Sequence, residues 1–121
     1  LYPGAIKVLE NLNKLNKRFV LMSNAPSPSK NVEKFLLNLK MNKIFVKTVF
    51  TSGEAALKSL EKNIYGKKFY HLGPNKDKDL MVGFEKNKTS LEKCDFILCT
   101  GLFENEEISL DYYKNLLRKY I

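Results

Sequence analysis

Residues 18–29 read RFVLMSNAPSPS, an apolar run followed at once by small hydrogen-bonding residues and two prolines. The apolar part, 19–22, is typical of a strand buried on both faces, as in a parallel sheet covered by helices. The prolines cannot extend this strand, because each lacks an amide donor and has a fixed φ. We therefore expect Ser23 and Asn24 at the carboxyl end of a buried strand. Ligands bind outside this edge of an open α/β sheet, so the hydroxyl and the carboxamide are candidates to hydrogen-bond an anion.

Helix and strand patterns alternate on both sides of this run. Before it, Pro3 occupies a possible first helical position, and apolar residues recur every three or four positions, which predicts a helix over residues 3–16. Strands that alternate with helices are joined as parallel neighbours through right-handed crossovers. The sequence therefore predicts an α/β fold. After the run, we expect helices over about 32–41, 53–60 and 108–120 and strands at 46–50, 68–72 and 96–99.

The segment 51–54, TSGE, has the pattern of a capping box. Thr51 can accept a hydrogen bond from the amide of Glu54 while the Glu54 side chain reaches back to Thr51. Helix capping alone explains this motif, which therefore predicts the start of a helix and no ligand site. Further along, Asp77 can cap a short helix that ends near residue 84.

Other polar residues have a structural interpretation beside a functional one. His71 lies in an expected strand, where it could face a ligand crevice or be a hydrogen-bonded, half-buried histidine. Cys94 and Cys99 are too few for a disulfide scaffold and, with one histidine in the chain, make a poor zinc site. We expect reduced thiols, with Cys99 buried. A group of acids either binds a cation or complements the dipole of the last helix; it comprises Glu104, Glu106, Glu107 and Asp111.

Length, composition and charge limit the class of protein. The 121 residues, 44% of them hydrophobic, suit one ordinary globular domain. No apolar run approaches the ~20 residues that span a bilayer, and no signal segment opens the sequence, so we expect a cytoplasmic chain with no membrane partner. The net charge of +8 suggests nucleic acid, but 19 of the 21 basic residues are lysines dispersed among 13 acids. This dispersion disfavours a nucleic-acid partner.

Four segments, in this order and spacing, carry a resemblance to a known family. They are LYPGAIKVLENLNKLNKRFVLMSNAPSPS (1–29), FTSGEAALKSL (50–60), FYHLGPNKDKDL (69–80) and CDFILCTGL (94–102). The sequence resembles haloacid dehalogenase (HAD) superfamily hydrolases of the NagD-like subclass (class IIA), whose α/β cap is inserted between the second and third catalytic motifs. The resemblance implies a Rossmann-like parallel sheet with alternating helices, a partial HAD core, over residues 1–52. Part of an α/β cap domain would follow over 53–121.

In complete members of this family, an aspartate of a D-x-D motif attacks phosphorus, a second aspartate acts as general acid and base, and Mg²⁺ neutralises the phosphate. A serine or threonine of the second motif hydrogen-bonds the phosphoryl oxygens. Ser23 matches that residue and Asn24 matches the asparagine that follows, so the resemblance implies that both contact substrate phosphate. Ala25 stands where this subclass often has a second asparagine, which alters part of the substrate contact.

The D-x-D strand would precede Leu1, and the later lysine and metal-binding acids would follow Ile121. The sequence thus contains no residue that matches a catalytic or Mg²⁺-binding position, although the resemblance implies Mg²⁺ and a phosphorylated small-molecule substrate in complete members. We expect a fragment, less than half of a complete member, that is inactive alone. Missing strands leave sheet edges open, which predicts weak stability or self-association.

Three functions from different classes stay open at this point. The first is a fragment of a HAD-type phosphatase. The second is a small α/β module that binds an anion or a partner chain without catalysis. The third is a basic nucleic-acid binder, whose affinity would fall steeply with salt. Ser23 and Asn24 also fit an ordinary turn, because Ser, Asn and Pro often satisfy their own backbone in turns.

Overall fold

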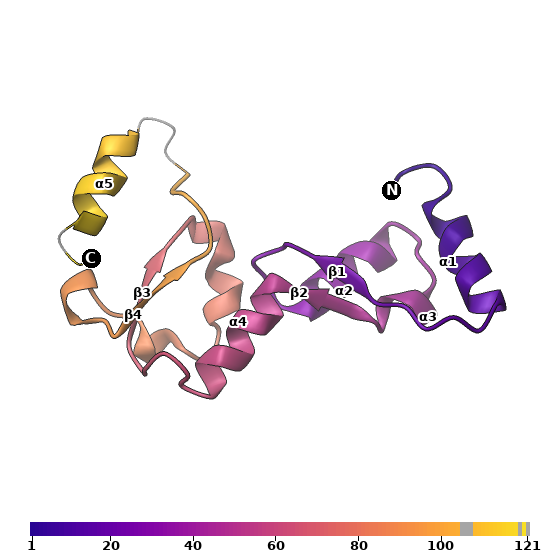
Figure 1. Cartoon of the computed structure of the whole chain (residues 1–121), viewed down its shortest axis with the longest axis horizontal. Helices are drawn as coiled ribbons and strands as arrows, with labels where there is room; N and C mark the ends of the chain where they lie inside the picture. Colours follow the sequence, from indigo (N-terminus) through magenta and orange to yellow (C-terminus); the bar gives the residue numbers. More distant parts are fainter. Residues whose placement is uncertain (105–107, 119, 121) are drawn as a thin grey trace. The chain divides into compact units, whose positions relative to one another are not determined.

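The computed structural model describes residues 1–104, 108–118 and 120. The chain divides into two compact units, Leu1–Ala56 and Leu57–Ile121. In each unit two strands pair in parallel, and helices separate the strands along the chain (Figure 1). The prediction of an α/β fold with parallel strands and alternating helices is therefore confirmed. None of the described helices is long and apolar enough to cross a membrane.

The first unit packs its helices on one face of a short parallel sheet. Leu21 lies opposite Val49 in the sheet, and Ser23 lies opposite Thr51. The elements in chain order are α1 (Ala5–Lys14), β1 (Leu21–Ser23), α2 (Ser29–Asn38), α3 (Lys43–Val46), β2 (Val49–Thr51) and α4 (Ser52–Glu61), which continues into the second unit. The buried apolar cluster of this unit consists of Leu9, Met41, Phe45, Val46 and Val49.

Several element boundaries in this unit differ from the sequence prediction. Strand β1 begins at Leu21 and not at Phe19, and α2 spans Ser29–Asn38 and not about 32–41. Helix α1 begins at Ala5 and not at Pro3, because Gly4 precedes it with a φ of 81°, a left-handed conformation that glycine adopts without strain. The strand predicted at 46–50 begins only at Val49. The residues before it form the short helix α3, in which Asn42 Oδ1 accepts a hydrogen bond from the Ile44 amide at 3.0 Å.

Strand β1 is not buried on both faces, so that prediction is wrong. Leu21 packs against the apolar cluster, whereas Met22 is 88% exposed. Successive side chains of a strand point to opposite faces, and one face of β1 carries the packing. The apolar run predicts a covered strand, but the residues that the structure describes do not supply the second cover.

The second unit contains another parallel pair, in which Phe69 lies opposite Phe96 and Leu72 opposite Cys99. Phe69 is fully buried and packs with Leu60 and Met81. The elements are the end of α4, β3 (Phe69–Leu72), three 3₁₀ helices (Asn75–Met81, Glu85–Asn87 and Leu91–Lys93), β4 (Phe96–Cys99) and α5 (Leu110–Arg118). The strands predicted at 68–72 and 96–99 are thus confirmed to within one residue.

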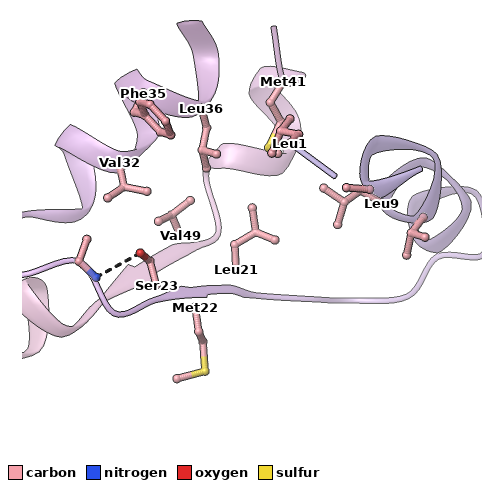
Figure 2. Close-up of a pocket in the computed structure, with 13 residues that line it drawn as sticks. Leu1, Leu9, Leu21, Met22, Ser23, Val32, Phe35, Leu36, Met41 and Val49 are labelled. Atoms are coloured by element: carbon pink, nitrogen blue, oxygen red, sulfur yellow. Dashed lines mark hydrogen bonds between the residues drawn. The ribbon is translucent and has the colours of Figure 1, made fainter. Parts of the chain in front are cut away.

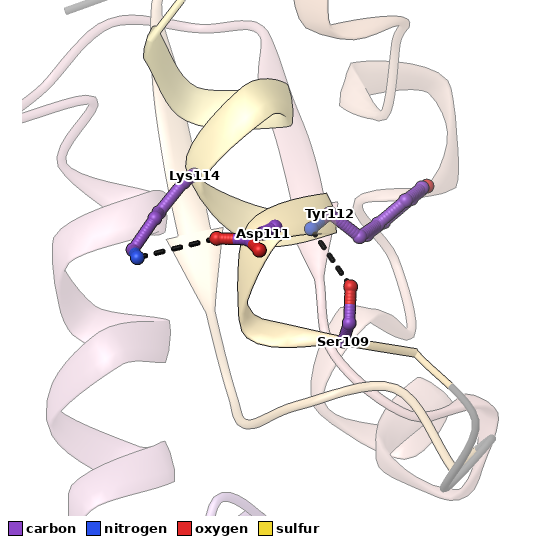
Figure 3. A network of polar contacts seen from close by, with 4 residues as sticks. All are labelled: Ser109, Asp111, Tyr112 and Lys114. Carbon is purple, nitrogen blue, oxygen red and sulfur yellow. Dashed lines mark hydrogen bonds and ion pairs between the residues drawn. The ribbon is translucent and has the colours of Figure 1, made fainter.

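Several side chains of this unit differ from expectation. Asp77 does not cap a helix, because the 3₁₀ helix starts after Pro74 and Asp77 lies inside it. Cys99 is exposed, which contradicts the prediction that it is buried. Asp111 lies in the first turn of α5 and forms an ion pair of 3.2 Å with Lys114 (Figure 3). Glu106 and Glu107 lie outside the described residues.

Candidate phosphate-binding site

The two candidate residues lie where the first parallel sheet ends. Ser23 is the last residue of β1, and Asn24 follows it directly. Thr51, the cross-strand neighbour of Ser23, is the last residue of β2. Parallel strands present their carboxyl ends at one edge of the sheet, so the loops after both strands meet there.

The Ser23 hydroxyl takes part in the turn and still retains a donor. Its Oγ accepts a hydrogen bond from the Ala25 amide at 3.2 Å (Figure 2), so the turn interpretation describes one half of its bonding. A serine hydroxyl also has one O–H donor, which this contact does not use. Asn24 is exposed and adds a carboxamide with two N–H donors.

The loops that follow the two strands are linked by the buried hydroxyl of Thr51. Thr51 Oγ1 donates to the Ser27 carbonyl at 2.7 Å and accepts from the Glu54 amide at 2.9 Å. The second contact confirms half of the predicted capping box. The first joins residues 24 positions apart, and no local motif in the sequence indicates it.

The other half of the predicted capping box is wrong. Glu54 Oε2 accepts a hydrogen bond from the Ser29 amide at 3.2 Å, at the start of α2, and so it does not reach back to Thr51. A carboxylate at this position stabilises the amide end of α2, whose first N–H groups have no partner within the helix. Glu54 therefore supports two helices, α4 through its backbone amide and α2 through its side chain.

Ala25 is held by the start of α4. Its carbonyl accepts from the Gly53 amide at 3.1 Å and from Ser52 Oγ at 3.0 Å. Glycine is needed at position 53 because a β-carbon there would lie 2.3 Å from the Ser27 nitrogen. The loop beside Ser23 and Asn24 is thereby fixed by contacts that sequence reasoning missed.

This arrangement offers the side chains of Ser23 and Asn24 as hydrogen-bond donors to a ligand. Ser23 Oγ contacts the backbone amide of Ala25, whereas a serine nucleophile needs an adjacent base. Within residues 1–104, 108–118 and 120, no three His, Cys, Asp or Glu side chains gather where they could hold a metal ion. The described residues do not by themselves form a Mg²⁺ site.

His71 lies in the second unit and is a hydrogen-bonded structural histidine. It is buried on β3, with Nε2 at 2.9 Å from Thr100 Oγ1. Burial lowers the pKa of His71, the positive charge of Lys88 lowers that pKa further, and Asp77 opposes both effects. His71 is therefore neutral near pH 7, and its hydrogen bond to Thr100 supports the structural interpretation of this residue.

Comparisons with known proteins agree with this fold. A model of the haloacid dehalogenase-like hydrolases matches residues 1–87. A hydrolase of that family from Brucella suis 1330 superimposes with a TM-score of 0.77 at 20% identity, covering 98% of this chain and 43% of its own. A search of curated proteins found no match.

Two further solved structures are 26% identical to this chain, each with a TM-score of 0.64. One is a putative nagD protein, of which 47% is covered, and the other is a 4-nitrophenylphosphatase from Thermotoga maritima, of which 46% is covered; both matches cover 99% of this chain. The chain thus spans less than half the length of each of these three structures. Because the family model matches well over half of the 121 residues, the chain belongs to the haloacid dehalogenase-like hydrolase family.

Proposed function

We propose that this chain contributes the phosphoryl-contacting end of a core strand to a HAD-type phosphomonoester hydrolase. Ser23 and Asn24 donate hydrogen bonds to the phosphoryl oxygens. The observation that supports this role is the O–H donor that Ser23 retains at the carboxyl end of β1, beside the exposed Asn24. Residues 1–52 belong to the core of this hydrolase and residues 53–121 to its cap.

The substrate class in this proposal is a phosphorylated small molecule, which the similarity to a 4-nitrophenylphosphatase supports. Mg²⁺ is the metal that the family resemblance implies, but the described residues do not form a site for it. The role that we propose for this chain therefore rests on the hydrogen bonds that Ser23 and Asn24 donate to the phosphoryl oxygens. A small α/β module that binds an anion or a partner without catalysis is the second candidate, and the exposed Met22 on β1 favours it.

The affinity for phosphate alone should be low. Two or three neutral hydrogen bonds contribute about 0.5–1.5 kcal/mol each, whereas a dissociation constant of 1 mM corresponds to about 4 kcal/mol. We therefore expect millimolar binding or weaker.

Titration of the ¹⁵N-labelled chain with inorganic phosphate tests this proposal. Amide shifts should appear at Ser23, Asn24 and Ala25, without saturation at low millimolar phosphate, and Ser23→Ala should reduce them. Ser90→Ala, an exposed serine of the second unit, is the matched control and should leave them unchanged. Shifts confined to lysine residues away from Ser23 and Asn24 would remove the assignment of the phosphate site, and micromolar saturation at Ser23 would favour the second candidate.

Hydrolysis gives a second test. The purified chain should hydrolyse 4-nitrophenyl phosphate no faster than a buffer blank, with or without Mg²⁺, because its sequence has no residue that matches the nucleophilic aspartate or the Mg²⁺-binding acids of complete members. A metal-dependent rate that follows the chain through purification and is lost in Ser23→Ala would contradict this expectation.

A further inference from the structure

A cavity of about 530 Å³ lies wholly in the second unit. Its lining includes Tyr70 of β3, Leu116 of α5, Glu92 of the 3₁₀ helix Leu91–Lys93, and Tyr120 just after α5. Sites for small molecules commonly have volumes of about 300–1,000 Å³. The cavity is therefore large enough for a small ligand, and it shares no residue with the candidate phosphate site of the first unit.

Tyr120 and Glu92 are held beside each other at the cavity. The Tyr120 amide donates to the Leu117 carbonyl at 2.9 Å, in a turn that follows α5. The Tyr120 hydroxyl donates to Glu92 Oε1, also at 2.9 Å, and so connects residues 28 positions apart. A phenol is neutral, so this bond orients the carboxylate without cancelling its charge.

The charge of the cavity lining differs from that of the chain. The sequence has 21 basic residues and a net charge of +8, yet the described residues that line the cavity include one acid, Glu92, and no lysine or arginine. Burial, then the charge of Tyr112 and then the charge of Glu92 raise the pKa of Tyr70. The negative charge of Glu92 thus reaches Tyr70. A field that opposes negative charge on this phenol favours a cation at the same place and disfavours an anion.

The rest of the lining combines aromatic and aliphatic side chains. The faces of aromatic rings such as those of Tyr70 and Tyr120 carry a negative quadrupole that attracts a cation within about 6 Å. Leu91 is buried and Leu116 is half-buried, so both offer apolar surface. A methylated ammonium suits this lining better than a primary one, because it has no N–H donors that must find acceptors.

We propose that this cavity of the second unit binds a small organic cation of the quaternary ammonium class. The cation contacts the rings of Tyr70 and Tyr120 near the Glu92 carboxylate, and its methyl groups pack against Leu116. The proposal does not depend on phosphate binding at Ser23, which lies in the other unit. The two proposals can therefore fail separately.

The test uses choline as the probe and the ¹⁵N-labelled full chain. Choline chloride replaces sodium chloride at constant ionic strength, so that amide shifts report choline and not salt. Shifts should appear at Tyr70, Glu92 and Leu116 and saturate in the millimolar range. Neohexyl alcohol, in which carbon replaces the ammonium nitrogen, has the same shape without the charge and should bind about tenfold more weakly or less. Equal binding of the two compounds would overturn the proposal.

Matched variants separate the contributions of charge and ring. Glu92→Gln keeps an acceptor for Tyr120 but removes the charge, so the dissociation constant for choline should rise about two- to fivefold. Glu61→Gln removes the same charge from an exposed position of this unit that does not line the cavity, and it should bind like the wild type. An equal effect of Glu61→Gln and Glu92→Gln would reduce the result to net charge and contradict a site.

Tyr70→Phe keeps the ring and should retain choline binding, whereas Tyr70→Leu should raise the dissociation constant about two- to fivefold. Spectra of each variant without choline check that it is folded, and Glu92→Gln at its exposed position tests the site even if Tyr70→Leu does not fold. Choline shifts confined to residues away from the cavity, or unchanged in Glu92→Gln, would overturn the assignment.

Discussion

Gly53 lies against the backbone of Ser27 so closely that a β-carbon on it would be 2.3 Å from the Ser27 nitrogen and 2.4 Å from the Ser27 oxygen. Both neighbours are backbone atoms, so they cannot move aside as the end of a flexible side chain can. This contact joins the start of α4 to the loop after β1. The candidate phosphate site therefore depends on Gly53, a residue that has no side chain.

Gly53→Ala should destabilise the first unit by roughly 1–3 kcal/mol, the usual cost of forcing extra atoms into a packed site. Urea denaturation followed by circular dichroism measures this loss of unfolding free energy. Gly101→Ala is the matched control, because a β-carbon there would meet Pro74 Cδ at an ordinary 3.5 Å. A neutral Gly53→Ala would show that the loop after β1 is less tightly packed than this distance implies.

Thr51→Val should cost about 1–3 kcal/mol of stability, because it leaves the Ser27 carbonyl and the Glu54 amide without their shared partner. Thr51→Ser keeps the hydroxyl and loses only a methyl group, so its cost should be about 1 kcal/mol. Denaturant midpoints of the two variants give the comparison. If Thr51→Ser cost as much stability as Thr51→Val, the methyl group of Thr51 would contribute as much as its hydroxyl, and this prediction would be wrong.

The pH dependence of the second unit should reflect Asp95. Hydrogen bonds from the Lys68 and Lys67 amides, at 2.9 and 2.8 Å, lower the pKa of Asp95 below its ordinary value of 3.8. Near pH 3.8 the unfolded chain thus binds more protons, so this stabilisation is present above that pH and is lost as the pH falls through the folded pKa. Thermal unfolding from about pH 6 to about pH 2.5 should show a smaller acid loss in Asp95→Asn than in the wild type. An identical acid loss in both would rule out a contribution from Asp95.

His71 should add a second pH dependence at higher pH. Burial, followed by the charge of Lys88, lowers the pKa of His71 from 6.5. As the pH falls, His71 therefore binds a proton in the unfolded state before it does so in the folded state. The contribution of neutral His71 to stability is fully present above pH 6.5 and is lost as the pH falls through the folded pKa. His71→Gln should remove this decrease, and Lys88→Gln should reduce it by letting the folded pKa rise. NMR titration of the imidazole checks the direction of the pKa shift independently.

Much of the fold is predictable because its signals are local. The end of the apolar run before Ser23 and the whole run before Thr100 lie in strands, and the spacing of apolar residues locates α1, α2 and α5 to within a few residues. The parallel pairing follows from the alternation of helices and strands. The strand predicted at 46–50 is wrong over residues 46–48. A run of β-branched and aromatic residues favours a strand there, whereas the Asn42 cap starts a short helix that ends at Val46.

The candidate site was predicted only as far as its place in the chain. The apolar run followed by prolines predicts that Ser23 and Asn24 lie at the end of a strand. The contacts that fix them are tertiary: Thr51 to Ser27, Glu54 to Ser29 and Gly53 to Ala25. Such pairs depend on which loops meet in three dimensions, and no spacing along the chain specifies them. The exposure of Met22 and Cys99 has a similar origin, since burial depends on what covers a strand and not on its own residues.

The excess of lysine in the first unit also affects how the chain behaves in concentrated solution. Charged side chains near an exposed strand keep copies apart by repulsion that acts over about 10 Å at 0.1 M salt and about 3 Å at 1 M. Residues 1–56, with nine basic and three acidic side chains, should therefore protect β1 from edge-to-edge association at low ionic strength. The protein should stay dispersed in dilute buffer and precipitate when salt is added. Purification at low salt follows directly from the net positive charge of the unit that contains β1.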